Sequence, residues 1–371
     1  MLTPQVVVVS LRGSGTQLLA QATTALGYTP YGTMGGTQSA HGDGPGPGEV
    51  HPLLMAAYGP DRTHRLLQDQ HVDCAALEAA FQEAVTALWR IWWLRLGQPV
   101  SLGSPVDPHL EGRLARVPDA DLIRLLPGRG CWYVNALDLQ RADGGFLRAW
   151  HTTGRPALVL HHRDVRDRII SQIKLLSQPV DRVGTQPEHL IYRDIVTALP
   201  TLEERITLAL TDPDFPGMRE ARHCQWLLHH PAVQVIAHED LAGPDHGGTD
   251  EGRTVALTTL LNAVGHSDHR AALTALTPAP PPCDAEDLSV GTWRTSFTPH
   301  HERLLRQHHG DLLPAGPSQV TGQGFSPEPL PMRVRRTTDG CAPVRRMGAG
   351  WLAADPHSYE PPAPETGCSV P

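Results

Sequence analysis

A glycine-rich segment near the start of the chain has the residue types of an anion-binding loop. Four valines at 6–9 lead into Arg-Gly-Ser-Gly-Thr at 12–16, and an apolar periodic segment follows. This order predicts a buried strand over 5–10, a tight turn, and a helix from about 15 to 26 that stops at Gly27. The helix start offers free N–H groups and the positive end of its dipole. The segment therefore predicts a phosphate or sulfate site, with an ordinary strand-to-helix turn as the alternative.

This loop differs from the loop of nucleoside triphosphatases. Their loop ends in Gly-Lys-[Ser/Thr], because a lysine must reach the β- and γ-phosphates and a hydroxyl must bind magnesium. No such lysine is present here; Arg12 stands at the rim of the loop, and Ser14 and Thr16 supply hydroxyls. The loop suits a smaller or differently charged terminal group that needs no metal.

A second group of polar residues follows a predicted strand in the middle of the chain. The apolar segment 157–161 predicts a buried strand, and an apolar stripe predicts a helix from about Val165. Arg163 stands at the end of this strand, and Ser171 lies inside the helix. A planar guanidinium and a hydroxyl placed in this way can bind one phosphate from two sides.

The surrounding elements place both groups at one edge of a sheet. A third strand is predicted at 233–237, and helices are predicted over 74–97 and 201–211, the latter opening with a capping box from Thr201 to Glu204. Strands that alternate with helices predict a three-layer, doubly wound α/β fold with a mostly parallel sheet. Ligands of such sheets bind at the carboxyl ends of the strands, so the two groups could face one ligand.

Composition limits the class of protein. The net charge of −8 argues against general nucleic-acid binding, which needs a positively charged surface. Six scattered cysteines without a Cys-x-x-Cys pair argue against a structural zinc site and against a disulfide framework. No apolar run reaches the length of a membrane span, and the chain begins with a strand pattern rather than a signal segment. We expect a soluble, reduced, cytoplasmic protein that binds neither nucleic acid nor membrane.

Patterning also divides the chain. Residues 1–315 are predicted to form the α/β domain, and 316–371, rich in proline and glycine, a weakly structured tail. The Gly/Pro/His-rich segment 32–52 is predicted to be a long loop. Within helix 74–97, the bulky face of Trp89, Trp92 and Trp93 favours core packing, with a wall of an acceptor pocket as the alternative.

In their order along the chain, these motifs resemble those of the bacterial, P-loop type of PAPS-dependent sulfotransferases. In that family a strand–loop–helix similar to 12–19 binds the 5′-phosphosulfate of the donor, and an arginine and a serine at positions matching Arg163 and Ser171 bind its 3′-phosphate. The Glu-Asp-Leu at 239–241 and the segment 201–206 also resemble family segments. Gly-Thr-Trp-Arg at 291–294, followed by Thr-Ser-Phe-Thr, resembles the C-terminal family motif.

The resemblance implies that a sulfuryl group moves from PAPS to a hydroxyl of a small-molecule acceptor and that PAP is the product. A natural product of secondary metabolism is one candidate for the acceptor. The resemblance leaves a homodimer open. The alternatives are a catalytically impaired nucleotide-binding relative and a P-loop kinase-like phosphotransferase. The residues expected to bind the donor are Arg12, Gly13, Ser14, Gly15, Thr16, Gln17, Arg163, Ser171, Trp293 and Arg294.

The chain departs from the family at three places. The loop cation, which the family places directly before Ser-Gly-Thr, is replaced by Gly13, and Arg12 lies one residue earlier as the candidate catalytic cation. The basic residues before Gly-x-Trp are replaced by Glu-Asp-Leu at 286–288. Asn135 stands where the family has the histidine that serves as its general base. The candidate general bases of this chain are therefore Asp138 and His151, ahead of the histidines at 161 and 162.

Overall fold

The computed structural model describes residues 5–33, 47–69, 74–98, 107–183, 187–266 and 288–313. The predicted tail at 316–371 and the acidic residues at 286–287 lie outside these residues. Cys74, Cys131 and Cys224 have free thiols. Among the described residues, no helix combines the length and the apolar character that a membrane span needs, and no three metal-ligating side chains converge.

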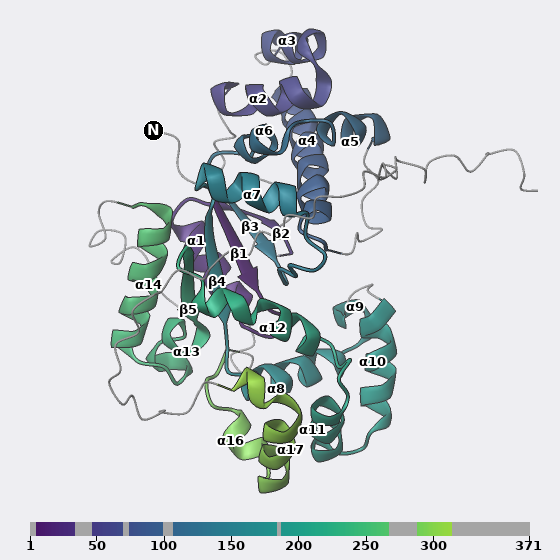
Figure 1. The fold of residues 1–371 in the computed structure, drawn as a ribbon, viewed down its shortest axis with the longest axis vertical. Helices are drawn as coiled ribbons and strands as arrows, with labels where there is room; N and C mark the ends of the chain where they lie inside the picture. Colours follow the sequence, from purple (N-terminus) through teal and green to yellow (C-terminus); the bar gives the residue numbers. More distant parts are fainter. Residues whose placement is uncertain are drawn as a thin grey trace, which may run out of the picture. The chain divides into compact units, whose positions relative to one another are not determined.

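The chain has an α/β fold built on a sheet of five parallel strands in the order β2-β3-β1-β4-β5 (Figure 1). Their bounds are β1 Val6–Ser10, β2 Thr29–Gly32, β3 Gly130–Val134, β4 Ala157–His162 and β5 Val233–Ala237. The chain goes from β1 to the edge strand β2, returns to β3 beside β1, and then crosses to β4 and β5 on the other side. Strand β1 is therefore central, and its carboxyl end lies at the switch point, where such sheets bind ligands. The prediction of a doubly wound parallel sheet is confirmed.

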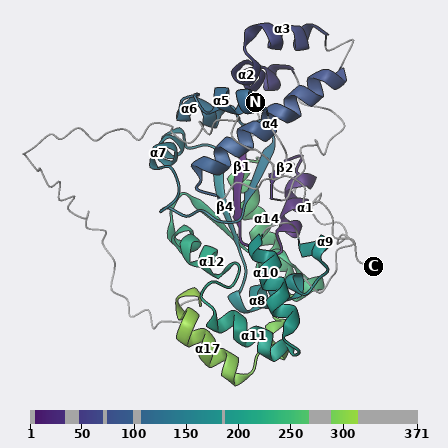
Figure 2. The ribbon, with the colours of Figure 1, turned by 90° about the vertical axis from the view of Figure 1, so that its right-hand side faces the viewer.

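Helices cover both faces of the sheet, because alternate side chains of each strand point to opposite faces. Val7, Val9 and Trp132 pack toward one group of helices, and Val6, Val8 and Tyr133 pack toward another. Figure 2 shows α7 and α1 on opposite sides of the strands. The first group comprises α2 (Pro47–Tyr58), α3 (Pro60–Gln68), α4 (Cys74–Arg95), α5 (Pro108–Leu114), α6 (Asp119–Arg124) and α7 (Gly144–Thr153); the second comprises α1 (Thr16–Ala25), α13 (His238–Leu241) and α14 (Asp250–Val264).

A third apolar cluster is formed by helices that gather beyond the carboxyl ends of the strands, at the bottom of Figure 1. These helices are α8 (Val165–Leu176), α9 (Val180–Val183), α10 (Pro187–Ala198), α11 (Leu202–Thr211), α16 (Trp293–Ser296) and α17 (Pro299–His309). Helix α12 (Met218–Cys224) and the 3-10 turn Gln225–His229 lead into β5, and two further 3-10 turns lie at Pro244–His246 and Gly310–Leu312. The apolar stripe that predicted α8 faces this cluster.

Most predicted elements are confirmed within a residue or two. The structure contains the predicted strands that begin after Gln5, Pro156 and Ala232. It also contains the helix from Val165 and the capping box at Thr201. Gly27 has a φ of 87° and follows the C-cap of α1.

The prediction of a loop over 32–52 is wrong at its end, because α2 begins at Pro47. Its composition indicates a loop, but Val50, Leu53, Leu54 and Ala57 recur at helical spacing and are buried where α2 packs against α4 and α5. Tertiary packing therefore overrides a weak local preference.

The tryptophan face of α4 packs in the core, as predicted. Trp92 is fully buried, with ring centroids 4.8 Å from Phe146 and 5.4 Å from Trp150. The Trp89 ring lies 4.7 Å from Trp132 of β3. These aromatic contacts fix α4 and α7 against the same face of the sheet.

Candidate functional site

The glycine-rich loop connects β1 to α1 at the carboxyl edge of the sheet. Gly13 and Gly15 have φ values of 77° and 74°, which disfavour any other residue. The Ser14 N–H donates to Leu11 O at 3.0 Å, and Gly15 caps α1 with no side-chain acceptor. Ser14 is buried, and among the described residues its Oγ has no hydrogen-bond partner. A helix of ten residues therefore begins behind a loop that contains an orphaned buried hydroxyl.

Two buried histidines support this loop from the neighbouring strand ends. A Cβ at Gly15 would lie 2.4 Å from Cε1 of His238, so the loop backbone rests directly on that ring. The Ser10 hydroxyl lies 3.0 Å from Nδ1 of His161 and 2.7 Å from the Thr16 hydroxyl. The Thr16 side chain is thereby held by a polar chain that starts at β4.

Both histidines are neutral at physiological pH. Burial, followed by the charge of Arg163, lowers the pKa of His238 to about 4. Burial, followed by the proximity of His238, lowers the pKa of His161 well below its usual range. The loop therefore lies on uncharged rings, and its positive potential comes from backbone N–H groups and arginines.

The second predicted group, at the β4–α8 corner, contacts the loop. Nη1 of Arg163 donates to Gly13 O at 3.1 Å, and Nη2 donates to Ser289 O at 2.7 Å. A Cβ at Gly13 would lie 3.0 Å from Arg168 O and 3.4 Å from Ser171 Cβ. The structure thus brings Arg163 and Ser171 to the glycine loop, while their role as phosphate ligands stays a prediction.

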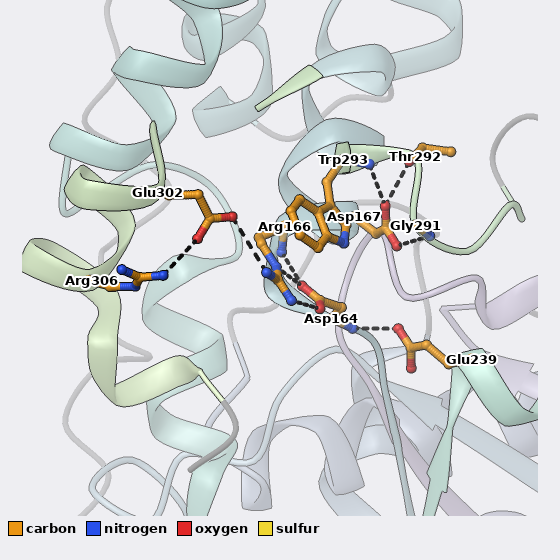
Figure 3. A network of polar contacts seen from close by, with 9 residues as sticks. All are labelled: Asp164, Arg166, Asp167, Glu239, Gly291, Thr292, Trp293, Glu302 and Arg306. Carbon is orange, nitrogen blue, oxygen red and sulfur yellow. Dashed lines mark hydrogen bonds and ion pairs between the residues drawn. The ribbon is translucent and has the colours of Figure 1, made fainter. Parts of the chain in front are cut away.

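The C-terminal motif is attached to the first turn of α8 by Asp167 (Figure 3). This buried carboxylate accepts hydrogen bonds from Gly291 N at 2.6 Å, from the Thr292 hydroxyl at 2.8 Å and from Trp293 N at 2.9 Å. Arg294 is exposed, and its guanidinium lies 5.3 Å from the centroid of the Trp293 ring. Sequence reasoning missed Asp167, because a carboxylate within a run of alternating charges reads as a solvated side chain.

Arg166 joins the same network (Figure 3). It binds both carboxylate oxygens of Asp164, at 2.9 and 2.6 Å, and its guanidinium lies 3.6 Å from the centroid of the Trp293 ring. The Asp164 N–H donates to Glu239 at 2.7 Å, which ties the end of β4 to α13. Glu302 of α17 lies 3.5 Å from Arg166. The start of α8 is therefore fixed from three directions.

Arg12, the candidate catalytic cation, lies against α10. Its Nη1 is 2.8 Å from Nδ1 and 2.9 Å from Nε2 of His189, and nearly equal distances place the guanidinium over the face of the ring. Burial, followed by the charge of Arg12, lowers the pKa of His189 to about 4, so this ring is neutral. Burial lowers the pKa of Arg12, while Glu220 and Glu188 oppose that effect.

The two candidate bases lie in different places. Asp138 is largely buried beyond the carboxyl end of β3, and its Oδ2 is 2.9 Å from Nδ1 of His223. His151 is exposed on the last turn of α7, which ends just before β4 begins. That turn belongs to the amino edge of the sheet, so the structure does not bring His151 to the loop. Gln17 is exposed on the first turn of α1.

Comparison with known proteins gives a distant likeness. No family model matches the sequence, and no curated protein matches it. Among solved structures, the chain is similar to the mouse sulfotransferase SULT7A1 complexed with PAP, with 11% sequence identity, a TM-score of 0.43 and 85% of each chain covered. A likeness this distant gives no information about the ligand of this chain.

Two glycine substitutions test how tightly the loop rests on His238. Gly15 and Gly27 both have positive φ, but a Cβ at Gly27 would meet nothing within 4 Å. Gly27→Ala is expected to lower the free energy of unfolding by about 1 kcal/mol, the cost of a side chain in this conformation. Gly15→Ala is expected to cost about 2 kcal/mol more because of the overlap with the ring. Equal losses in urea unfolding would contradict the contact.

The neutral histidines predict an acid-sensitive fold. The folded-state pKa of His238, about 4, lies below the usual value of 6.5, so the unfolded chain binds a proton that the folded chain does not. The free energy of unfolding is therefore expected to fall as the pH drops from about 6.5 to about 4, with a contribution from His238 of about 3 kcal/mol. Urea unfolding across this range should show a shallower pH dependence for His238→Gln; an identical dependence refutes the assignment.

Removal of the Asp167 carboxylate tests the attachment of the C-terminal motif. Asp167→Ala leaves two backbone N–H donors without their acceptor, so we expect the free energy of unfolding to fall by about 3 kcal/mol. Proteolysis within 288–293 should become faster. Asp194, which is 77% exposed on α10, provides the control, and Asp194→Ala is expected to stay within about 0.5 kcal/mol of wild type. A similar loss for both variants argues against the network.

Proposed function

We propose that this chain is a sulfotransferase that moves a sulfuryl group from PAPS to a hydroxyl of a small-molecule acceptor. The observation that carries the proposal is the contact between the two strand-to-helix corners. Gly13 O accepts from Arg163, and Gly13 packs between Arg168 and Ser171, although 150 residues separate Gly13 from Arg163. One ligand with two anionic ends can therefore contact both corners at once.

The residues of the loop fit an oxyanion donor. The positive φ of Gly13 and Gly15 and the absence of room for a Cβ leave the backbone open to close approach. The orphaned Ser14 hydroxyl is a hydrogen-bond donor already removed from water, so a sulfate or phosphate oxygen would relieve its unmade bond. We propose that the N–H groups from Gly13 to Gln17, with the Thr16 hydroxyl, bind the 5′-phosphosulfate.

The 3′-phosphate would bind at the other corner. Arg163 presents a fork that two phosphate oxygens can share, and a phosphate there would compete with the Ser289 carbonyl, now 2.7 Å from Nη2. Ser171 would add a neutral hydrogen bond. Trp293 is held at the same corner by Asp167, and the Arg294 guanidinium lies near the Trp293 ring. We propose that both residues border the nucleotide.

The chemistry assigned to the protein is positioning and charge stabilisation, as in phosphoryl transfer. Arg12 would neutralise the charge that develops on the bridging oxygen as it leaves. A base would take the proton of an acceptor hydroxyl held in line with sulfur. The natural-product class of the acceptor, the homodimer, the tail at 316–371 and the cytoplasmic location stay predictions.

Calorimetric titration with PAP tests the nucleotide site. Arg163→Ala is expected to weaken PAP binding about a hundredfold, because it removes a charge-assisted fork. Ser171→Ala is expected to weaken binding only about fivefold, because it removes one neutral hydrogen bond. Arg124, whose side chain is 71% exposed on α6, provides the control, and Arg124→Ala should bind as wild type does.

Because Arg163 also joins two backbone segments, each variant needs a melting curve before titration. An unchanged PAP affinity in a folded Arg163→Ala variant overturns the proposal. A parallel titration with ATP and magnesium tests the kinase alternative. A kinase would bind ATP with magnesium more tightly than PAP, whereas a sulfotransferase would bind PAP more tightly. Transfer of labelled sulfate from PAPS to a panel of phenols and alcohols separates an active enzyme from a binding-only relative.

A further inference from the structure

Helix α12 spans the edge of the sheet beside the glycine loop. At its C-terminal end, Cys224 Sγ accepts from Leu137 N at 3.2 Å, just beyond the end of β3. At its N-terminal end, Met218 Sδ lies 3.8 Å from Nη2 of Arg168 on α8. Because β1 lies between β3 and β4 in the sheet, a helix that contacts both the segment after β3 and helix α8 lies near the loop that follows β1.

One side of α12 is buried, and polar side chains lie on the rest of the helix. Met218, Ala221 and Cys224 are buried, which fixes the inward side of the helix. Glu220 and His223 are three residues apart and so share a neighbouring face. Glu220 is the largest source of charge acting on Arg12, where it raises the pKa against the effect of burial. The contact of His223 with Asp138 places His223 beside the segment that follows β3, the strand next to β1 in the sheet.

His223 and Asp138 form an ordered pair. Nδ1 of His223 lies 2.9 Å from Oδ2 of Asp138, and the other carboxylate oxygen accepts from Gln140 N at 2.9 Å. The Asp138 side chain is 11% exposed, whereas the His223 side chain is 31% exposed. A carboxylate oxygen this close to Nδ1 favours the tautomer that has its proton on Nδ1 and its lone pair on Nε2. Within the part of the chain that the structure describes, Nε2 has no hydrogen-bond partner.

We propose that His223 is the general base of the transfer reaction and that Asp138 is its positioning residue; this inference rests on the proposed function. The acceptor oxygen forms its bond to sulfur while the bond from sulfur to the bridging oxygen breaks. The electron pair of the broken bond stays on the 5′-phosphate of PAP. The hydroxyl proton passes to Nε2 of His223, and Asp138 stabilises the imidazolium. Asp138 thus serves through His223 rather than as the base itself.

The test combines PAP titration with sulfate transfer from PAPS to phenol, to the more acidic para-nitrophenol and to water. His223→Gln is expected to lower transfer to phenol about a hundredfold or more, while PAP affinity stays within about twofold. The loss should be much smaller with para-nitrophenol, which gives up its proton without help. Asp138→Asn should lower transfer about tenfold or more and move the acid limb of the pH–rate profile. His229→Gln is the control, because His229 is exposed on the turn after α12.

A second variant separates catalysis from structure. His223→Ala is expected to regain transfer activity when imidazole is added, which a structural role for the side chain would not allow. If wild type and His223→Gln bind PAP and transfer sulfate equally, this inference is overturned while the proposed function stands. A loss of equal size for both phenols also overturns the inference and leaves the proposed function standing. If wild type binds no PAP, both the base assignment and the proposed function are overturned. If wild type binds PAP but releases no sulfate above the buffer rate, the base assignment is overturned.

Discussion

The candidate site depends on a close approach of backbone segments that only glycine permits. Gly13 lies against the carbonyl of Arg168, and Gly15 lies against the ring of His238. Each contact presses the loop after β1 onto an element that begins a hundred or more residues later. A side chain at Gly13 would lift the loop away from α8, and a side chain at Gly15 would lift it away from the start of α13. Because of these two contacts, the β1–α1 loop and the β4–α8 corner lie together. Helix α12 packs beside them.

Charge at this edge of the sheet is arranged around the same contact. Arg12 lies over a neutral imidazole, and Arg168 is buried next to the sulfur of Met218. Burial lowers the pKa of Arg168 to about 10, with Glu220 opposing the effect. Holding guanidinium groups in such surroundings costs free energy, because neither partner carries a full negative charge. These two guanidinium groups therefore lower the stability of the fold.

The sequence predicts those elements whose signal is local. Strands β1, β4 and β5 are continuous apolar runs, and α8 has a regular stripe, so their bounds are nearly right. Strand β2 contains Pro30 and Gly32, and β3 begins with a glycine and places Trp132 and Tyr133 on opposite faces, so neither has a strand pattern of its own. The glycine loop and the β4–α8 corner were recognisable because motif order places them at strand ends.

What the sequence could not predict is contact across long separations. The hydrogen bonds of Asp167 join residues 124 or more positions apart, and no local pattern distinguishes this carboxylate from its neighbours. The pair of His223 with Asp138 similarly joins two elements that the chain visits far apart. Only packing against the sheet brings them together. For that reason Asp138 was a candidate base by position, whereas its histidine partner had no signal at all.

The displaced cation of the loop has a physical explanation in this geometry. The resembled family places lysine or arginine where this chain has Gly13, but here that position has a φ of 77° and a Cβ would lie 3.0 Å from Arg168 O. A long basic side chain cannot begin there without moving α8. Position 12 precedes the tight turn and is half-buried, so its side chain can extend over the ring of His189. The loop gains close contact with α8 through glycine and keeps its positive charge one residue earlier.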